Sequence, residues 1–496
     1  MTRHALADVG DVYDLAVVGG GVSGAYVAWR AVAERPGWRI GLFEASARIG
    51  GRLLSLRLDG IPRVRAELGG MRFRTSQPLV CAAVNALGLE VRPFLTVRDD
   101  NRYFLRGQAW RAGEPQSAAS AYAVPPVLGG LTPAEVLVAA FQRVVPGALE
   151  LTDAEWAEVR RSFDFRGRPL RDWSLGEVLT AVLDPESRQY VVDGFGYQTL
   201  LEDRNAADAI PWVLIEARPE AENQTLVDGM ERLPRALAEA FEAMGGTTAT
   251  GHRLRAIGVD GGMDGSMRLA FDGRGDIVAQ RLVLALPPRV LAGIEGDLAP
   301  RRGHEVLIGS VTATPASKLF LAYDRPWWRT DGFAAMRTVS DLPLSKTYYF
   351  DFERDGPAST AAAMLLASYA DGSNRDVWVA LAEPTETSDD LAYDADGRWD
   401  AYRASPAQLA AASEQLAAIH PAASVPPPIR AAFVDWTDGA WHTWNPGVRS
   451  EEVMAAVVRP RADAAIWVSG EAFSASQGWV EGALESAERA LGQLLA

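Results

Sequence analysis

Three glycines near the start of the chain have the spacing of a phosphate-binding loop. Gly19, Gly21 and Gly24 form a G-x-G-x-x-G pattern directly after the apolar run YDLAVV of residues 13–18. In such a loop the first glycine allows a tight turn, the second lets a pyrophosphate approach the backbone, and the third lets the following helix pack on the strand. Glu44 ends the next apolar run, at the spacing where a carboxylate accepts both hydroxyls of a ribose. The pattern predicts a dinucleotide site.

Arginines and glycines follow the predicted ribose carboxylate. The segment EASARIGGR, residues 44–52, contains Arg48, Gly51 and Arg52. Arginine recognises phosphate through paired hydrogen bonds, and glycine lets a ligand approach the backbone closely. These residues therefore suit a second stretch of pyrophosphate or cofactor contact. A solvated basic turn explains the same residues equally well when they are taken alone.

The two segments together resemble the flavin-containing amine oxidase family, which includes monoamine, polyamine and L-amino-acid oxidases. Near the C-terminus, IWVSGE and QGWVEGA are similar to the family's second flavin signature. The resemblance implies an FAD cofactor, with Glu471 near its ribitol and phosphate and the backbone at Trp479 and Val480 near its isoalloxazine. Some members bind FAD through a cysteine in the C-terminal loop. Residues 472–478 contain none, so we expect non-covalent FAD.

A further segment narrows the resemblance to the L-amino-acid oxidase branch. Residues 67–73, ELGGMRF, are similar to that branch's version of the segment. The resemblance implies that Gly70 and Met71 contact the cofactor and that Arg72 pairs with the carboxylate of the substrate. A guanidinium beside a flavin is costly to bury unless an anion satisfies it. An arginine paired with a local aspartate or glutamate is the alternative interpretation.

Two later residues match active-site positions of the same branch. Tyr369, in the segment MLLASY, corresponds to a tyrosine whose hydroxyl helps to hold the carboxylate, and residues 341–349 also resemble this branch. Lys318, in the segment KLFL, corresponds to a lysine that holds a water near flavin N5. On the residues alone, Tyr369 is equally well a core aromatic residue of a strand, and Lys318 an edge-strand lysine that faces solvent.

Aromatic residues cluster before and within the C-terminal motif, where they can wall a substrate pocket. The residues of this predicted wall are Trp436, Trp441, His442, Trp444, Gly478 and Trp479. Ordinary core packing is the alternative for each tryptophan, and a lone histidine is more often a packed, hydrogen-bonded group than a base. The resemblance implies that the substrate amine faces the carbonyl of Gly478. The tryptophans favour a bulky or aromatic substrate side chain.

The elements around these motifs alternate between β and α. Residues 13–43 predict a strand, a helix and a strand, which is a right-handed crossover unit. Capping boxes, in which a hydroxyl residue precedes glutamate by three positions, predict helix starts at Thr132, Thr152 and Ser174. The other predicted elements are helix 233–244, a β-rich stretch from about 248 with strands at 281–288, 311–323 and 347–382, helix 405–419, strand 465–469 and helix 478–495.

We therefore predict an α/β fold with two domains, of the FAD-dependent amine oxidase type. A chain of 496 residues is too long for one ordinary core, which agrees with two packed domains. The predicted parts are a Rossmann-like FAD-binding domain (1–75, 225–310 and 430–496), a β-sheet substrate-binding domain (76–120 and 311–430) and a helical insertion (121–224).

Composition excludes several classes of protein. The net charge of −15 argues against a nucleic-acid partner, because little would neutralise a phosphate backbone. The single cysteine, Cys81, rules out an intrachain disulfide, and the five histidines lack metal-ligand spacing, so no metal is expected. No apolar stretch has the roughly 18 residues that a membrane span needs, and we expect a soluble cytoplasmic protein. Dimers are common among the enzymes that the chain resembles, which makes a homodimer one expectation.

The predicted reaction is the oxidative deamination of an L-α-amino acid. Hydride transfer to flavin N5 would give an imino acid, which water converts to a 2-oxo acid and ammonia, while O2 reoxidises the flavin and becomes H2O2. Three alternatives stay open: an amino-acid 2-monooxygenase that decarboxylates its substrate to an amide, a polyamine or monoamine oxidase, and a flavin-binding protein without catalysis.

Overall fold

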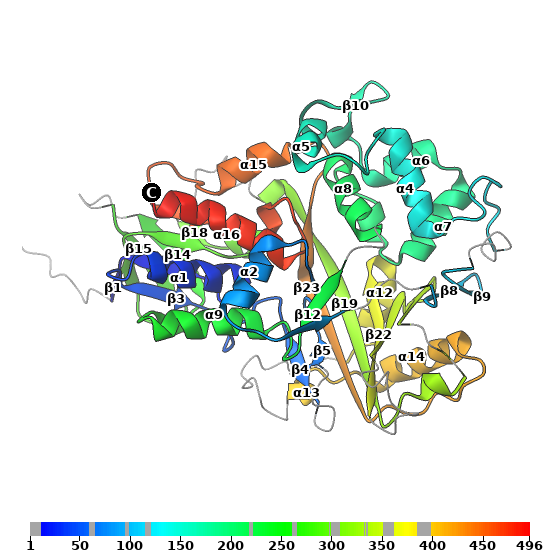
Figure 1. The fold of residues 1–496 in the computed structure, drawn as a ribbon. Coiled ribbons are helices and arrows are strands. Elements are labelled where there is room, and N and C mark those ends of the chain that lie inside the picture. The colour runs from blue at the N-terminus through cyan, green and yellow to red at the C-terminus, as the bar shows by residue number, and fades with distance from the viewer. Residues whose placement is uncertain are drawn as a thin grey trace, which may run out of the picture.

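The computed structural model describes most of the chain, and Figure 1 shows its helices and strands. The described residues are 11–58, 65–94, 99–114, 121–217, 222–259, 265–296, 298, 308–331, 333, 336–350, 362–383 and 398–496. Within these ranges, no helix is both long enough and apolar enough to cross a membrane.

A parallel sheet forms around the N-terminal strand, in the order β13-β3-β2-β17-β24. Its strands are β2 (Leu15–Val18), β3 (Ile40–Phe43), β13 (Thr247–Ala249), β17 (Leu282–Leu284) and β24 (Ile466–Val468). All four pairings are parallel, and the strands come from the beginning, the middle and the end of the chain. Parallel strands are usually covered on both faces, which explains their uninterrupted apolar runs.

Helices cover one face of this sheet, and a second sheet covers the other (Figure 1). The helices are α1 (Val22–Glu34), α9 (Arg232–Ala243) and α16 (Val480–Leu494), and the second sheet contains β1 (Val12–Tyr13), β14 (Leu254–Val259), β15 (Met267–Phe271), β16 (Ile277–Ala279) and β18 (Glu295–Gly296). Leu15 packs with the helices, and Ala16 packs with the second sheet, because successive strand residues face opposite sides. Ligands of such open α/β sheets bind at the carboxyl ends of the strands.

A seven-stranded sheet lies beside this unit, in the order β23-β19-β22-β21-β20-β8-β9 (Figure 1). Its strands are β8 (Arg102–Leu105), β9 (Gln108–Arg111), β19 (Val311–Tyr323), β20 (Arg337–Ser340), β21 (Lys346–Phe350), β22 (Ala363–Asp371) and β23 (Arg430–Trp444). The prediction grouped residues 430–496 with the FAD-binding part, but β23 pairs with β19 in this sheet. The pairing satisfies the backbone of β19, whose 13 residues would otherwise have one unpaired edge.

A group of helices from residues 133–217 forms its own apolar core above this sheet (Figure 1). The helices are α4 (Pro133–Val144), α5 (Asp153–Ser162), α6 (Leu175–Val182), α7 (Pro185–Phe195) and α8 (Ala206–Ala217). The three predicted capping boxes are confirmed: the side chains of Thr132, Thr152 and Ser174 each accept a hydrogen bond from the backbone N–H of the glutamate three residues on. The capping boxes therefore mark real helix starts in this insertion.

The predicted strand at 347–382 is right only in part. β21 and β22 are strands, but α12 (Gly372–Ala380) is a helix, and residues 351–361 lie outside the described residues. β22 ends at Asp371, whose carboxylate accepts the backbone N–H groups of Gln198 and Thr199 at 3.0 Å. Gly372 then adopts a φ of +55°, which glycine tolerates best, and the chain turns into the helix.

The remaining elements connect these units. They are β4 (Ser55–Arg57), β5 (Arg65–Glu67), β6 (Phe73–Arg74), α2 (Pro78–Ala86), β7 (Val91–Pro93), β10 (Asp164–Phe165), β11 (Arg168–Pro169), β12 (Asn223–Leu226), α10 (Pro288–Ala292), α13 (Arg398–Ala401), α14 (Pro406–Ile419) and α15 (Ser450–Val457). The helices predicted at 233–244, 405–419 and 478–495 are confirmed as α9, α14 and α16.

Candidate active site

The glycine loop joins β2 to α1. Gly19 has a φ of +109°, and a Cβ there would lie 2.4 Å from the carbonyl oxygen of Ala285, just after β17. A Cβ on Gly24 would lie 1.9 Å from the carbonyl oxygen of Gly19, so this glycine lets α1 pack closely. Gly21 has more room, since the nearest atom to its Cβ position, the Cα of Gly51, is 3.8 Å away. Two glycines thus shape the turn, and the third leaves space for a ligand.

A second glycine pair meets this loop. Gly50 donates its N–H to the carbonyl of Gly20 at 3.0 Å, and a Cβ on Gly51 would lie 2.9 Å from the Cα of Gly21. In the described part of the chain, no side chain caps the start of α1 and no acidic residue occupies its first turn. The free N–H groups and the positive end of the helix dipole form a ready site for an anion. This cradle fits a pyrophosphate.

Glu44 lies where β3 ends, beside the glycine loop. Its Oε2 accepts the N–H of Gly20 at 2.6 Å, and its Oε1 accepts both the N–H and the hydroxyl of Ser46 at 2.8 Å. These bonds fix the carboxylate and leave lone pairs for other donors. Its contact with ribose hydroxyls stays a prediction. Arg48, in contrast, donates to the carbonyls of Gly51 and Leu53, so it braces its own loop instead of facing a phosphate.

A cavity of about 1430 Å³ extends from the glycine loop to Trp479. The predicted cofactor residues that line it are Gly19, Gly21, Glu44, Arg52, Gly70, Glu471 and Val480. Gly24 does not line it because this residue is packed inside α1, and Met71 lines a neighbouring cavity. With an anion cradle and the Glu44 carboxylate at one end, this cavity suits an extended dinucleotide such as FAD. We call it the FAD cavity.

An ion pair lies on one side of the FAD cavity. Arg52 Nη2 is 2.8 Å from Glu471 Oε2, and Glu471 Oε1 accepts the N–H groups of His442 at 2.8 Å and Gly478 at 3.0 Å. Burial alone raises the pKa of the Glu471 carboxyl, but the charge of Arg52 and the contacts with His442 hold it well below its usual value. The charged carboxylate therefore ties β23 to the loop that precedes α16.

His442 and Trp444 do not line a substrate pocket, contrary to the prediction. Side chains alternate along β23, so Trp441 faces the cavity described next while His442 faces Glu471. Trp444 donates its indole N–H to the carbonyl of Ser474 at 3.2 Å and packs near Phe473. Both residues support the C-terminal loop and make no contact with the pocket.

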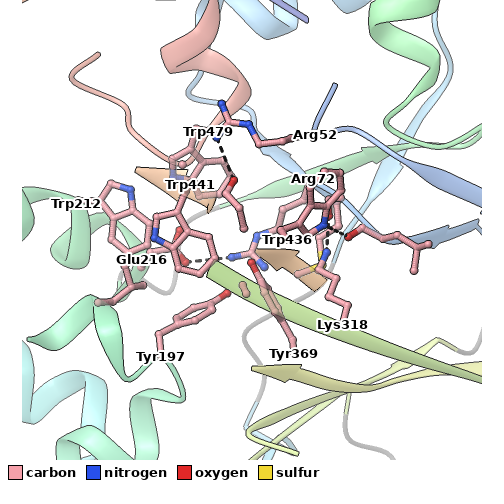
Figure 2. Close-up of a pocket in the computed structure, with 18 residues that line it drawn as sticks. Arg52, Arg72, Tyr197, Trp212, Glu216, Lys318, Tyr369, Trp436, Trp441 and Trp479 are labelled. Carbon is pink, nitrogen blue, oxygen red and sulfur yellow. Dashed lines mark hydrogen bonds and ion pairs between the residues drawn. The ribbon is translucent and has the colours of Figure 1, made fainter. Parts of the chain in front are cut away.

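A second cavity, of about 790 Å³, adjoins the FAD cavity (Figure 2). Six residues line both: Arg52, Gly70, Arg72, Ala440, Gly478 and Trp479. The other residues of the second cavity are Leu68, Gly69, Met71, Tyr197, Leu200, Trp212, Glu216, Ala316, Lys318, Tyr369, Trp436 and Trp441. Four predicted active-site residues, Arg72, Lys318, Tyr369 and Trp479, line this substrate cavity. A molecule bound there would meet the end of the cofactor that is far from the glycine loop.

Arg72 lies at the junction of the two cavities, and its side chain is only 11% exposed. Its Nη2 forms an ion pair with Glu216 Oε2 at 3.2 Å, while its Nε and Nη1 are buried without a hydrogen-bond partner in the described structure. Buried donors without an acceptor are costly. The sequence allows two interpretations of Arg72: a partner of the substrate carboxylate, or a partner of a local acidic residue. The structure combines them, because Glu216 pairs with Arg72 and two of its donor nitrogens have no protein acceptor in the described structure.

Lys318 lies on β19 and is buried. The interpretation as an edge-strand lysine is wrong, because β19 runs between β22 and β23. Its Nζ donates to the carbonyl of Glu67 at 2.9 Å and to that of Gly69, and it lies 4.8 Å from the ring centre of Tyr369. Burial lowers the pKa of Lys318. The negative charge of Glu67 raises this pKa, and the positive charge of Arg72 lowers it, so the net shift is downward. A lysine with a lowered pKa in a cavity can accept a proton.

Aromatic rings form much of the lining of the substrate cavity. The ring centre of Tyr197 is 5.4 Å from that of Tyr369 and 6.2 Å from that of Trp441, both edge to face. Figure 2 shows Tyr369 pointing toward the guanidinium of Arg72. Burial raises the pKa of Tyr369, so its hydroxyl stays protonated and able to donate. Arg72 and Tyr369 together present donors that suit a carboxylate.

Comparison with known proteins shows the family of this chain. A family model described as flavin containing amine oxidoreductase matches residues 34–495. The chain belongs to this flavin-containing amine oxidoreductase family. Aplysianin-A of Aplysia kurodai is 27% identical over 97% of this chain and 90% of its own. An L-amino-acid oxidase of Echis ocellatus is 23% identical over 70% of this chain and 67% of its own. A putrescine oxidase structure with bound putrescine has a TM-score of 0.70 at 18% identity, over 98% of this chain and 99% of that one, which shows the fold.

As a flavin-containing amine oxidoreductase, the protein is an FAD-dependent enzyme that oxidises a carbon–nitrogen bond. The predicted two-domain amine oxidase fold is confirmed. The loop 472–478 contains no cysteine, and Cys81, the one cysteine of the chain, lies on α2 and lines neither cavity. FAD is therefore held without a covalent bond to cysteine.

Sequence reasoning missed the part of the site that the helical insertion contributes. Tyr197, Leu200, Trp212 and Glu216 line the substrate cavity, and all come from the predicted helical insertion, where the sequence predicted no site residue. One local signal was present: Trp212 and Glu216 are four residues apart on α8, so they share one face of the helix. Which face meets the cavity depends on how the insertion packs on the sheet.

Proposed function

We propose that this flavin-containing amine oxidoreductase is an L-amino-acid oxidase. The observation that carries the proposal is the pair of donor nitrogens of Arg72, Nε and Nη1, which are buried without an acceptor in the described structure, on a residue that lies where the two cavities meet. The carboxylate of an amino acid would accept hydrogen bonds from both, whereas a simple amine would leave them unsatisfied. The relative from Echis ocellatus, named as an L-amino-acid oxidase, supports the same substrate class.

Three groups of the chain would orient such a substrate. The carboxylate would lie against Arg72 and Tyr369, and the amine would face the carbonyl of Gly478. The peptide of Gly478 is held in place, because its N–H donates to Glu471 at 3.0 Å and its φ is +80°. With the carboxylate and the amine fixed, the side chain and the hydrogen on Cα occupy defined directions, so only one enantiomer can point its hydrogen into the FAD cavity.

The rest of the substrate cavity suits a bulky apolar side chain. Its remaining walls are largely aromatic and aliphatic: Tyr197, Leu200, Trp212, Trp436 and Trp441. Trp436 and Trp212 are fixed by their indole N–H groups, which donate to the carbonyls of Leu68 at 2.8 Å and Gln477 at 3.0 Å. Rigid apolar walls favour large side chains by burial of their surface. An aromatic or large aliphatic L-amino acid is therefore the proposed substrate.

The chemistry requires the amine to be neutral, because its lone pair forms the new C=N bond as the Cα–H bond breaks. FAD supplies the two-electron acceptor, and O2 takes up these electrons and two protons to become H2O2. Lys318, whose pKa burial lowers, is placed in the same cavity to accept the proton that a substrate ammonium must lose. The resulting imino acid reacts with water to give a 2-oxo acid and ammonia.

Product stoichiometry tests the proposal against its alternatives. One L-amino acid consumed should give one 2-oxo acid, one ammonia and one H2O2. CO2 is measured with catalase present, because H2O2 decarboxylates 2-oxo acids, and none should then be released. Release of CO2 with an amide would identify an amino-acid 2-monooxygenase. Turnover of diamines or monoamines without any amino acid would identify an amine oxidase. The predicted cytoplasmic location and homodimer stay predictions.

A further inference from the structure

A carboxylate from the helical insertion faces Arg72 in the substrate cavity (Figure 2). Glu216 is the second-to-last residue of α8, and its side chain is 14% exposed. Trp212, one helical turn earlier, lines the same cavity and anchors this end of α8 by its bond to Gln477. After α8 the chain forms β12, where Asn223 pairs with Arg74 of β6. The bond of Trp212 thus holds the end of α8 that carries Glu216 beside the C-terminal loop.

Two arginines share this carboxylate. Glu216 Oε2 is 3.2 Å from Nη2 of Arg72, and Glu216 Oε1 forms an ion pair with Nη2 of Arg74. Arg72 and Arg74 flank Phe73 in an extended segment, so both face the glutamate while Phe73 enters the core. Arg74 is 7% exposed, lines neither cavity, and lies over the ring of Trp479 at 4.1 Å. Arg74 is therefore a fixed cation that is separated from both cavities, whereas Arg72 is the cation of this pair that lines them.

The charges of this cluster do not balance. Two guanidinium groups and one carboxylate leave one net positive charge, and the unused donors are on Arg72. Burial alone raises the pKa of Glu216, but the charges of Arg74, Arg72 and Lys346 hold it below its ordinary value, so the carboxylate stays charged. Burial lowers the pKa of Lys346 itself, which leaves the two arginines as the main cations of the cluster. One added monoanion at Arg72 would neutralise the cluster. The same anion would lie close to the negative charge of Glu216 and would share the guanidinium with it.

We propose that Glu216 is a specificity-determining residue: it competes with the substrate carboxylate for Arg72, and Arg74 retains it when the substrate binds. The proposal rests on the proposed function in taking Arg72 as the carboxylate site. In the resting enzyme Glu216 supplies a counter-charge that a buried arginine needs. It weakens the binding of every anion, and an amino acid overcomes this through its amine and side-chain contacts. Small carboxylates that lack those contacts are rejected.

The test measures the Kd of benzoate from the change that it causes in the absorbance of bound FAD. The holoenzymes compared are wild type, Glu216→Gln and Glu158→Gln, which removes one charge from the exposed surface of α5. Glu216→Gln should bind benzoate about tenfold or more tightly, because a like charge near the anion is removed. Glu158→Gln should bind it like wild type. In Glu216→Gln, the KM for the best L-amino acid should fall together with the Kd of benzoate, while kcat changes little. A merely structural role of Glu216 would not lower KM and leave kcat nearly unchanged.

A second variant is needed because Glu216→Gln removes the partner of Arg74, and an unpaired Arg74 would disturb the site. Glu216→Gln combined with Arg74→Gln removes both charges, and it should still bind benzoate more tightly than wild type. Unchanged or weaker binding in both variants overturns the proposal, and so does loss of FAD from both. Arg72→Gln should abolish benzoate binding, and persistent binding would show that the anion sits elsewhere. The proposed function fails separately, if no L-amino acid reduces the wild-type flavin.

Discussion

Replacement of Arg72 by glutamine should lower kcat/KM for the best L-amino acid about a thousandfold. Removal of one partner from a buried, hydrogen-bonded charge pair costs about 2–5 kcal/mol, and about 4 kcal/mol corresponds to a thousandfold change in rate. Arg72 is buried at the junction of the cavities. Among the described residues, Arg52 is the one other arginine that lines both cavities, and its guanidinium is paired with Glu471. Steady-state peroxide production measures the effect.

The decarboxylated amine with the same side chain is the matched substrate. It has no carboxylate for Arg72 to bind, so its kcat/KM, however low, should be similar in wild type and Arg72→Gln. Arg161→Gln, which removes an exposed arginine from α5, should leave the turnover of both compounds unchanged. If Arg72→Gln lowers the turnover of both by the same factor, Arg72 serves the fold or the flavin and does not bind a substrate carboxylate.

Replacement of Gly24 by alanine should remove FAD from the purified protein. The new Cβ would lie 1.9 Å from the carbonyl oxygen of Gly19 and 3.1 Å from the Cβ of Ala285, so α1 must move away from β2 and β17. Both atoms belong to the loops that shape the anion cradle, and the backbone oxygen cannot yield as a flexible side chain would. FAD content is measured from the ratio of flavin to protein absorbance, and it should fall below about a tenth of wild type, since FAD binding depends on this turn.

Gly37→Ala is the matched control, because a Cβ at Gly37 would meet no atom within 4 Å. This variant should retain full FAD content. Added FAD should restore the flavin spectrum of Gly24→Ala only at concentrations far above those that saturate the wild-type apoprotein. If Gly24→Ala is purified with a full complement of FAD, cofactor binding does not depend on the close packing of α1 against the glycine loop.

The parts of the site that sequence predicted correctly depend on local chemistry. Gly19 and Gly24 are required by the geometry of one strand, one turn and one helix, so a short segment contains the whole signal. The capping boxes at Thr132, Thr152 and Ser174 are equally local, because each helix start needs only a hydroxyl and a glutamate three residues on. Such signals do not depend on how distant parts of the chain pack.

The errors concern features that tertiary contacts decide. Trp441, His442 and Trp444 are neighbours in sequence, but only the first faces the substrate cavity, because the register of β23 against β19 sets which side chains point there. That register shifts between Thr314 and Ala316, and no pattern within β23 reveals it. A cluster in the sequence therefore became two groups on opposite faces of one sheet.

The partner of Arg72 could not be predicted for a similar reason. Glu216 lies more than a hundred residues away in the chain and reaches Arg72 only because the helical insertion that contains α8 packs on the seven-stranded sheet. Sequence reasoning weighed an ion pair against a substrate carboxylate as alternatives. The fold accommodates both, since one glutamate uses only part of the guanidinium and leaves two of its donor nitrogens without a protein acceptor in the described structure.

The most direct test of the central claim is the reduction of the bound flavin without oxygen. Wild-type holoenzyme is mixed anaerobically with L-amino acids, their D-enantiomers and the matching decarboxylated amines, and the flavin absorbance is followed. We expect rapid bleaching by an aromatic or large aliphatic L-amino acid, none by its D-enantiomer, and only slow bleaching by its amine at the same concentration. Bleaching by the amines and by no amino acid would contradict the proposal that Arg72 selects a carboxylate.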